Sequence, residues 1–361
     1  MNRKKALGPA AIAIGILGAA WWCTVSWRVG LPHGSVKVAS VSSWGKASTR
    51  SKLMQADKRY FWTTDGDLLR PQKAGDGSTI VLREHLTPLN TLQSDPSPPV
   101  RVPGGASFLQ PTPDGSGLLY WRPSAVHIND MDVHLLTADG KADRLLPALW
   151  MMNTVWMPDG KHWIVTRDDG DFLNSTDGAP FRKLSTQTIG SFAPYVLGVN
   201  QESHAIATFG NEWFEASNPT YGAKAINYPT VLLIEFDPAA SSPSGKGWRV
   251  HAPERSIRGQ ILLSPRADRI LWAVEKQAPV FAQWLDRIRS GNNKVLLRDQ
   301  AVYVSRMDGS DMRELFSASM ERQNTGKFVS VRRPLSDIRW LPDGKRISFV
   351  YKDDLYLAPV H

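Results

Sequence analysis

Short, β-prone apolar runs alternate with tight polar turns along the chain, and one turn recurs. Trp-Met-Pro-Asp-Gly-Lys at 156–161 precedes the apolar run 162–165, and Trp-Leu-Pro-Asp-Gly-Lys at 340–345 precedes the run 346–349. A third copy has Pro-Asp-Gly at 113–115, and the degraded fourth copy reads Ser-Pro-Arg-Ala-Asp. Repetition of this kind is typical of a repeat architecture.

The recurring turn predicts a hairpin between two strands. Proline presets φ for the first corner, aspartate bonds to the backbone further along, and glycine adopts the left-handed conformation that closes the hairpin. The run after each turn is short and apolar, as a buried strand requires. Each copy therefore predicts the first two strands of one structural unit.

An alternating strand that ends in a polar turn follows each hairpin at a variable distance. With two weaker units, the series has six units, whose turns lie near residues 57, 113, 158, 202, 265 and 342. A spacing of about 45 residues suits four strands and their loops. We therefore expect residues 29–361 to form an all-β, six-bladed β-propeller of four-stranded antiparallel blades. Another all-β fold is the alternative.

The repeat resembles that of the TolB-like six-bladed β-propellers. The pattern is Trp or Ser, any residue, Pro-Asp-Gly-Lys, an apolar strand, a variable loop, and then Leu-Tyr-Leu or Val-Tyr-Val. The resemblance covers roughly residues 50–361 and implies four antiparallel strands per blade around a central channel. The Tol-system translocation protein carries an α/β domain before its propeller. Since residues 29–56 leave no room for one, we expect that domain to be absent.

The sequence also predicts how the ring closes. The last alternating run, 354–357, would be the third strand of the last blade. The run Ser-Val-Lys-Val-Ala-Ser-Val at 35–41 alternates well and precedes the first unit. We expect it to pair with the last blade as the fourth strand, which removes both free edges.

The N-terminus carries a membrane-targeting pattern. Residues 6–27 are mostly apolar and uncharged, and they follow Arg3, Lys4 and Lys5. About 20 apolar residues span the hydrocarbon core, and tryptophans such as Trp21 suit its interfaces. We expect residues 1–28 to be a single-pass anchor with a cytoplasmic N-terminus and an extracytoplasmic body, periplasmic or extracellular. The alternative is a cleaved signal peptide, which also exports the body.

Composition narrows the compartment and the partners. The 361 residues are 42% apolar and 21% charged, and they include one Cys, which excludes a disulfide framework and a multi-cysteine zinc site. The net charge is +9, and loss of residues 1–20 would leave +6. A mildly basic surface suits an anionic lipid surface or an acidic wall polymer, or it serves solubility alone. No basic run resembles a nucleic-acid arm, so we expect no nucleic-acid partner.

The turn pattern assigns the loops to two faces. The Pro-Asp-Gly turns join first and second strands and lie on one face, whereas the loops between second and third strands lie on the other. Those loops are long near 123–131, 210–229 and 276–299, and long loops on a rigid scaffold commonly carry binding. The last one has helical apolar spacing. The candidate binding residues are Trp213, Phe214, Tyr221, Phe281, Trp284, Arg287 and Arg289. The alternative is that the apolar stripe packs on the propeller rim.

Motifs for catalysis and cofactors are missing. The sequence has no Gly-x-Ser-x-Gly elbow, no P-loop and no dinucleotide fingerprint. His127, Asp130, Asp132 and His134 are the densest metal candidates, and the acidic run at 168–171 could suggest calcium, but neither has a recognised ligand spacing. We expect no metal and no cofactor.

These patterns support three hypotheses for function. The leading one is an extracytoplasmic, membrane-anchored scaffold that binds an envelope protein or a wall polymer without catalysis. The second is a glycan lyase or hydrolase with carboxylates at the central channel. The third is a sensor domain whose anchor pairs with other membrane helices. A pair of carboxylates in the channel would favour the enzyme, and an aromatic rim without such a pair would favour the binder.

Overall fold

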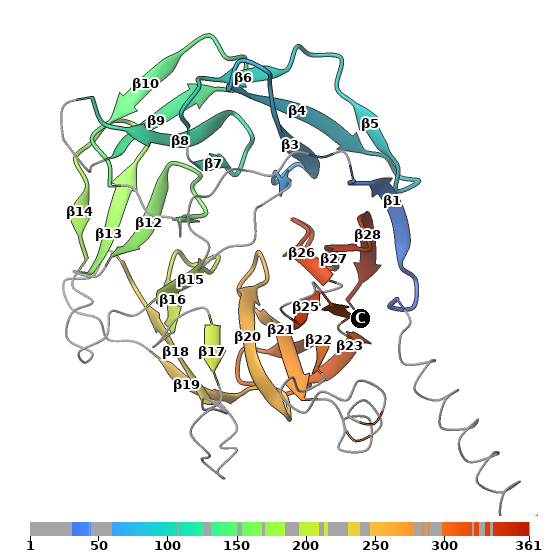
Figure 1. Ribbon diagram of the computed structural model, residues 1–361. Coiled ribbons are helices and arrows are strands. Elements are labelled where there is room, and N and C mark those ends of the chain that lie inside the picture. Colours follow the sequence, from blue (N-terminus) through green and yellow to red (C-terminus); the bar gives the residue numbers. More distant parts are fainter. Residues whose placement is uncertain are drawn as a thin grey trace, which may run out of the picture.

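The chain forms a ring of six β-sheets in a computed structural model (Figure 1). The structure describes residues 31–42, 44, 60–106, 108–125, 131–149, 154–167, 170–184, 195–208, 213–215, 230–238, 246–277, 284, 288, 298–319, 321–324, 329–332 and 335–360. The predicted all-β, six-bladed propeller of four-stranded antiparallel blades is confirmed.

The blades follow one another along the chain, and each begins next to the channel (Figure 1). Blade 1 contains β2 (Phe61–Trp62), β3 (Asp67–Lys73), β4 (Thr79–Leu86), β5 (Leu92–Ser94) and β6 (Val100–Val102). Blade 2 contains β7 (Phe108–Pro111), β8 (Gly117–Pro123), β9 (Met131–Thr137) and β10 (Asp143–Leu146). Blade 3 contains β11 (Thr154–Trp156), β12 (His162–Arg167), β13 (Gly170–Ser175) and β14 (Arg182–Lys183).

The second half of the ring has the same plan with one addition. Blade 4 contains β15 (Tyr195–Val199), β16 (Ala205–Thr208), β18 (Thr230–Phe236) and β19 (Gly247–His251). Blade 5 contains β20 (Ser256–Leu263), β21 (Arg269–Gln277), β22 (Arg298–Arg306) and β23 (Arg313–Ser319), and β17 (Trp213–Glu215) pairs with β20. Blade 6 contains β26 (Leu335–Trp340), β27 (Arg346–Tyr351) and β28 (Asp354–Pro359). The hairpin of β24 (Glu321–Asn324) and β25 (Val329–Arg332) precedes blade 6.

The predicted closing strand is confirmed. Strand β1 (Val36–Ser40) pairs antiparallel with β28 and forms the fourth strand of blade 6. The register places Val36 opposite Leu357 and Ser40 opposite Asp354. The first strand of the fold therefore completes the last blade, so neither edge of that sheet is left open.

The hydrophobic core consists of six clusters, one between each pair of neighbouring blades. The cluster between blades 6 and 1 contains Val41 and Val350 from one side and Tyr60 and Leu68 from the other. Complete burial of such side chains stabilises the fold by about 1.5–3 kcal/mol each. Each blade therefore packs against both of its neighbours through buried apolar side chains.

Blade 1 departs from the regular pattern at both ends. Position 57, where the spacing predicts the first turn, lies outside the described residues, and the equivalent turn is 63–66. Its outer strand is split into β5 and β6, which both pair with β4. Pro96, Pro98 and Pro99 lie in the interruption, and proline cannot donate a ladder hydrogen bond.

The expected N-terminal membrane helix is unsupported, since residues 1–30 lie outside the described residues. Within the described part of the chain, no helix has the length and apolar character needed to cross a bilayer.

Candidate functional site

Six tight turns between first and second strands share one hydrogen-bonding scheme. In blade 3 the Met157 N–H donates to the His162 carbonyl (2.8 Å), and the Gly160 N–H donates to the Met157 carbonyl (3.0 Å). The residues equivalent to Met157 are Thr63, Thr112, Asn200, Ser264 and Leu341. These turns define one face of the ring, which we call the tight-turn face.

The predicted turn chemistry is confirmed where the motif is complete. Gly115, Gly160 and Gly344 have φ values of 68°, 65° and 63°, in the left-handed region. The Asp159 carboxylate accepts a hydrogen bond from the Lys161 N–H (2.8 Å), and Asp343 accepts one from Lys345 (2.8 Å). Each turn is therefore fixed by its own residues.

The residue before each turn lies at the end of a first strand, next to the channel. These six residues are Trp62, Pro111, Trp156, Val199, Leu263 and Trp340. Two of the indoles are held by hydrogen bonds: Trp62 Nε1 donates to Ser348 Oγ (2.9 Å), and Trp340 Nε1 donates to the Leu262 carbonyl (3.2 Å). Trp156 packs against Trp163, with ring centroids 5.3 Å apart. The three indoles therefore have fixed orientations.

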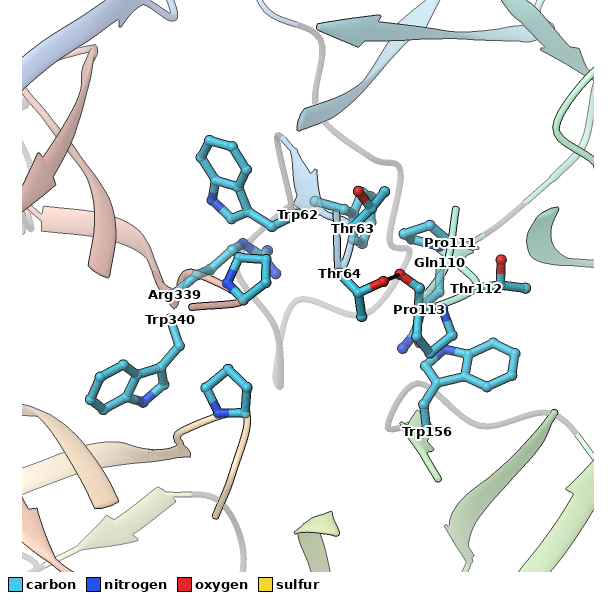
Figure 2. Close-up of a pocket in the computed structure, with 13 residues that line it drawn as sticks. Trp62, Thr63, Thr64, Gln110, Pro111, Thr112, Pro113, Trp156, Arg339 and Trp340 are labelled. Atoms are coloured by element: carbon cyan, nitrogen blue, oxygen red, sulfur yellow. Dashed lines mark hydrogen bonds between the residues drawn. The ribbon is translucent and has the colours of Figure 1, made fainter. Parts of the chain in front are cut away.

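A cavity of about 360 Å³ opens among these residues at the channel end, and we call it the tight-turn mouth (Figure 2). Its lining residues are Phe61, Trp62, Thr63, Thr64, Gln110, Pro111, Thr112, Pro113, Trp156, Pro265, Arg339, Trp340 and Pro342. Figure 2 shows Arg339 beside Trp62 and Trp340, with Trp156 across the mouth next to Pro113. Ligand sites are commonly concave and aromatic with a few polar groups, as this mouth is.

Among the described residues that line the mouth, Arg339 is the one with a charged side chain. Its guanidinium carbon lies 5.4 Å from the ring centre of Tyr60 and 5.5 Å from that of Phe61. Its Nε is buried and has no hydrogen-bond partner among the described residues. The described lining residues include no Asp or Glu. The mouth therefore has a positive charge that none of these residues neutralises.

Two further polar atoms in the wall of the mouth lack partners among the described residues. They are the Gln110 Oε1 acceptor and the Trp156 Nε1 donor, both buried. The amide nitrogen of Gln110 donates to the Thr154 carbonyl (3.2 Å), which fixes the orientation of the amide. Atoms of the same kind occur away from the mouth, such as Trp163 Nε1 and Arg70 Nε, so they do not by themselves mark a ligand site.

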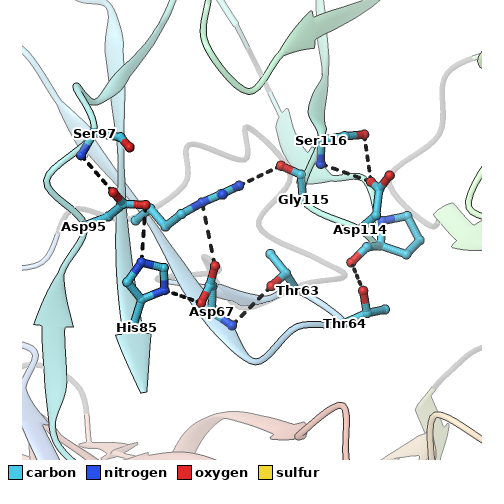
Figure 3. A network of polar contacts seen from close by, with 11 residues as sticks. Thr63, Thr64, Asp67, His85, Asp95, Ser97, Asp114, Gly115 and Ser116 are labelled. Atoms are coloured by element: carbon cyan, nitrogen blue, oxygen red, sulfur yellow. Dashed lines mark hydrogen bonds and ion pairs between the residues drawn. The ribbon is translucent and has the colours of Figure 1, made fainter. Parts of the chain in front are cut away.

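Polar contacts join the turns of blades 1 and 2 beside the mouth (Figure 3). The Thr64 N–H and hydroxyl both donate to the Pro113 carbonyl at 2.7 Å. Arg83 Nη2 donates to the Gly115 carbonyl at 2.6 Å. These bonds run from one blade to the next and hold two walls of the mouth in register.

An imidazole between two carboxylates supports the same region (Figure 3). His85 Nδ1 lies 2.5 Å from Asp67 Oδ1, and its Nε2 lies 3.4 Å from Asp95 Oδ2. A hydrogen bond from the Ser97 N–H lowers the pKa of Asp95 below its ordinary value. This group ties β3 and β4 to the residue after β5, so it positions the turn at 63–66.

A second cavity, of about 520 Å³, lies between blades 1 and 2. Its wall has cations (Arg70, Arg83, Lys141) and equally many carboxylates (Glu84, Asp95, Asp139). The Arg70 and Glu84 side chains pair at 3.2 Å. Because these charges balance, this groove should discriminate less between anionic and cationic ligands than the tight-turn mouth does.

The candidate binding residues on the long-loop face are only partly placed. Trp213 and Phe214 lie in β17, which extends blade 5 on the channel side, instead of in a free loop. Trp284 and Ile288 have helical backbone, and their side chains are 53% and 62% exposed. Tyr221, Phe281, Arg287 and Arg289 lie outside the described residues. The structure therefore does not bring this set together.

Of the candidate metal ligands, His127, Asp130, Asp168 and Asp169 lie outside the described residues, whereas His134 and Asp171 have other contacts. His134 is 4% exposed, stacks on Tyr120 and lies 3.1 Å from Asp143 through Nδ1. Asp171 is buried and accepts a hydrogen bond from Thr166 (2.5 Å). Among the described residues, Glu202, His204 and Glu235 form a group of possible ligands within 4.8 Å. The His204–Glu235 pair, at 3.1 Å, accounts for that group.

Searches with family models and among curated proteins find no match. The chain is similar to a structure from Agrobacterium tumefaciens assigned as TolB: 17% identity over 84% of this chain and 90% of the other, TM-score 0.43. It is also similar to the β-propeller domain of the Trilobed protease from Pyrococcus furiosus: 10% identity, 82% and 78% coverage, TM-score 0.42. Neither similarity assigns a family or a function, and the six-bladed fold rests on the sheets of this chain.

Sequence reasoning identified Trp156 and Trp340 as repeat residues without assigning them to a site. Their shared position could have indicated a site, because Trp62 also directly precedes a tight turn, at 63–66, although that turn lacks the proline. No sequence pattern indicates Arg339 as a site residue, because a single arginine before a repeat tryptophan is not distinctive.

Proposed function

We propose that this chain is a non-catalytic binding scaffold of the cell envelope, anchored by its N-terminal segment, and that the tight-turn mouth is its binding site. The observation that carries the proposal is the composition of the mouth: three indoles with defined contacts, one arginine, and no carboxylate among the described lining residues. Fixed side chains favour affinity because little conformational entropy is lost on binding.

The mouth supports binding more than it supports glycoside chemistry. Hydrolysis of a glycosidic bond ordinarily uses two carboxyl groups that flank the scissile bond, one of them as the acid. The lining of the tight-turn mouth supplies neither. The side chains there can stack, donate and accept hydrogen bonds, and attract an anion.

The register of β1 supports an orientation towards the membrane. Val36 opposes Leu357, and Pro359 at the end of β28 opposes Arg346, directly after the turn at 341–345. The chain therefore enters blade 6 from the tight-turn face. If residues 1–28 anchor the protein, this face lies nearer the membrane and the long-loop face points away from it.

The long-loop face is a second proposed contact surface, for an envelope protein. Trp284 and Ile288 are four residues apart and exposed, which places two apolar side chains on one side of a helical turn. Arg287 and Arg289 add positive charge to the same segment in the sequence.

Photo-crosslinking in native membranes tests the proposal. A photoreactive residue replaces Thr64, which is exposed at the mouth, and a control replaces Leu145, which is 59% exposed on an outer strand. We expect one defined species to be captured from position 64, to be absent from position 145, and to be lost with Arg339→Gln. Equal capture from both positions would contradict the mouth as the site. Turnover of an envelope glycan by the purified chain would establish the enzyme instead.

A further inference from the structure

We propose that the tight-turn mouth binds the terminal unit of an acidic saccharide chain, with sugar rings stacked on its tryptophans and a carboxylate held by Arg339. This inference rests on the proposed function and names the class of ligand. The carrying observation is the combination of aromatic side chains and a cation in one cavity whose described lining residues include no carboxylate.

The half-buried indoles of Trp62 and Trp156 offer stacking surfaces at the mouth, whereas Trp340 is 8% exposed and packs mainly in the core between blades 5 and 6. Trp62, Trp156 and Trp340 come from blades 1, 3 and 6 and end three different first strands. Pyranose rings present faces of C–H groups, and the negative face of an indole attracts such groups. Since hydrogen bonds hold Trp62 and Trp340 in place, stacking requires little reorganisation.

The charge of the mouth selects an anion. The Arg339 guanidinium rests on Tyr60 and Phe61 at 5.4 and 5.5 Å, and no carboxylate lines the cavity. A guanidinium is weakly hydrated and presents a planar fork of donors, which matches a carboxylate. The net charge of +9 would attract a polyanion to the molecule before it reaches the mouth.

The accessible polar groups of the wall favour a ligand that has hydroxyl groups. Thr64 is exposed, and its hydroxyl donates to the Pro113 carbonyl, so its oxygen can accept a bond from a ligand hydroxyl. A uronic acid combines hydroxyl groups with a carboxylate, whereas a lipid tail offers neither. The volume of about 360 Å³ is at the small end for ligand sites, which suits a chain terminus.

Isothermal titration calorimetry with the full chain in detergent micelles tests the inference. The probes are a uronic acid hexasaccharide and its methyl ester, which has the same sugar backbone without the charge. We expect the ester to bind about tenfold more weakly than the acid, as for loss of a hydrogen bond to a charged group. Arg339→Gln should weaken binding of the acid to the level of the ester, and Arg339→Lys should have an intermediate effect.

Two further variants distinguish binding at the mouth from a general effect of net charge. Arg306→Gln removes one exposed arginine that pairs with Asp311 on the rim, and it should change the affinity less than twofold. Thr64→Trp fills the mouth from an exposed position and should abolish binding of both saccharides. Unchanged near-ultraviolet circular dichroism would confirm that each variant is folded.

Several outcomes would overturn the inference. These are equal binding of acid and ester, no effect of Arg339→Gln, displacement of the saccharide by hexaglutamate at equal concentration, or Arg339-dependent binding of anionic vesicles without binding of the saccharide. If no saccharide binds while crosslinking from position 64 persists, the ligand class is wrong and the proposed function stands. If that crosslinking is also absent, both are wrong.

Discussion

On the tight-turn face, the connections between first and second strands have four residues in blade 1 and five in each other blade. On the opposite face, the connections between second and third strands range from residues 352–353 in blade 6 to residues 278–297 in blade 5 and 209–229 in blade 4. A repeated local motif determines the length of the connections on the tight-turn face. Insertions between the strands determine the length of those on the opposite face. A rigid mouth and a variable face can therefore belong to one ring.

Strand β1 closes the ring on which both faces depend. Disrupting this closure should therefore lower the free energy of unfolding more than any other change considered below. Val41 is 1% exposed between blades 6 and 1. Val41→Asp places an unpaired charge there and should lower the free energy of unfolding by about 3–5 kcal/mol. Val36→Asp, in β1 at 38% exposure and five residues before Val41, should change it by less than about 0.5 kcal/mol. Urea unfolding measures both, and equal effects would contradict closure by β1.

Packing between the turns of the tight-turn face should have the next largest effect. Gly115 and Gly160 have similar positive φ, so alanine at either position should cost about 1–2 kcal/mol. A Cβ at Gly115 would lie 3.0 Å from Arg83 and Thr63, whereas nothing lies within 4 Å at Gly160. Gly115→Ala should therefore cost about 1 kcal/mol more than Gly160→Ala in unfolding experiments. Equal costs would indicate that each turn is independent of its neighbours.

Local chemistry explains which parts of the fold the sequence predicts. The Pro-Asp-Gly turns, the apolar strands and the pairing of 35–41 with the last blade depend on short motifs and on strand alternation. The mouth depends on Trp62 and Trp340, 278 positions apart, and on Arg339, which no motif marks. Strand β17 is three residues from a blade 4 connection that pair with blade 5, and nothing in their spacing indicates that partner.

Acidification should lower the free energy of unfolding through the turns of the tight-turn face, by less than the glycine substitutions do. Although burial alone would raise the pKa of Asp114, hydrogen bonds from Thr112 and Ser116 lower it below 3.8. The pKa of Asp343 is also lowered: its burial is outweighed by bonds from Lys345 and Arg346. A carboxyl whose pKa is lower in the folded than in the unfolded state stabilises the fold at pH above its unfolded pKa. This stabilisation is lost as the pH falls through its folded pKa.

The free energy of unfolding should therefore fall below about pH 4. Asp343→Asn keeps an acceptor oxygen without the titrating group. In a urea series at decreasing pH, this variant should have a shallower fall than the unsubstituted chain. Parallel curves would show that the Asp343 turn does not contribute to the acid sensitivity.

The long-loop face should show the smallest effect on stability and a separate effect on binding. Ile288 is 62% exposed, so Ile288→Ser should change the free energy of unfolding by less than about 0.5 kcal/mol. Ile347, which is fully buried between blades 5 and 6, is the matched control, and Ile347→Ser should cost several times more. If the segment contacts a partner, capture by a photoreactive residue at position 284 should fall in the Ile288→Ser variant. A loss of stability above 1 kcal/mol would mean instead that its apolar stripe packs on the propeller rim. In that case insertions on this face would serve the ring itself, and the tight-turn mouth would be the binding surface that the described structure supports.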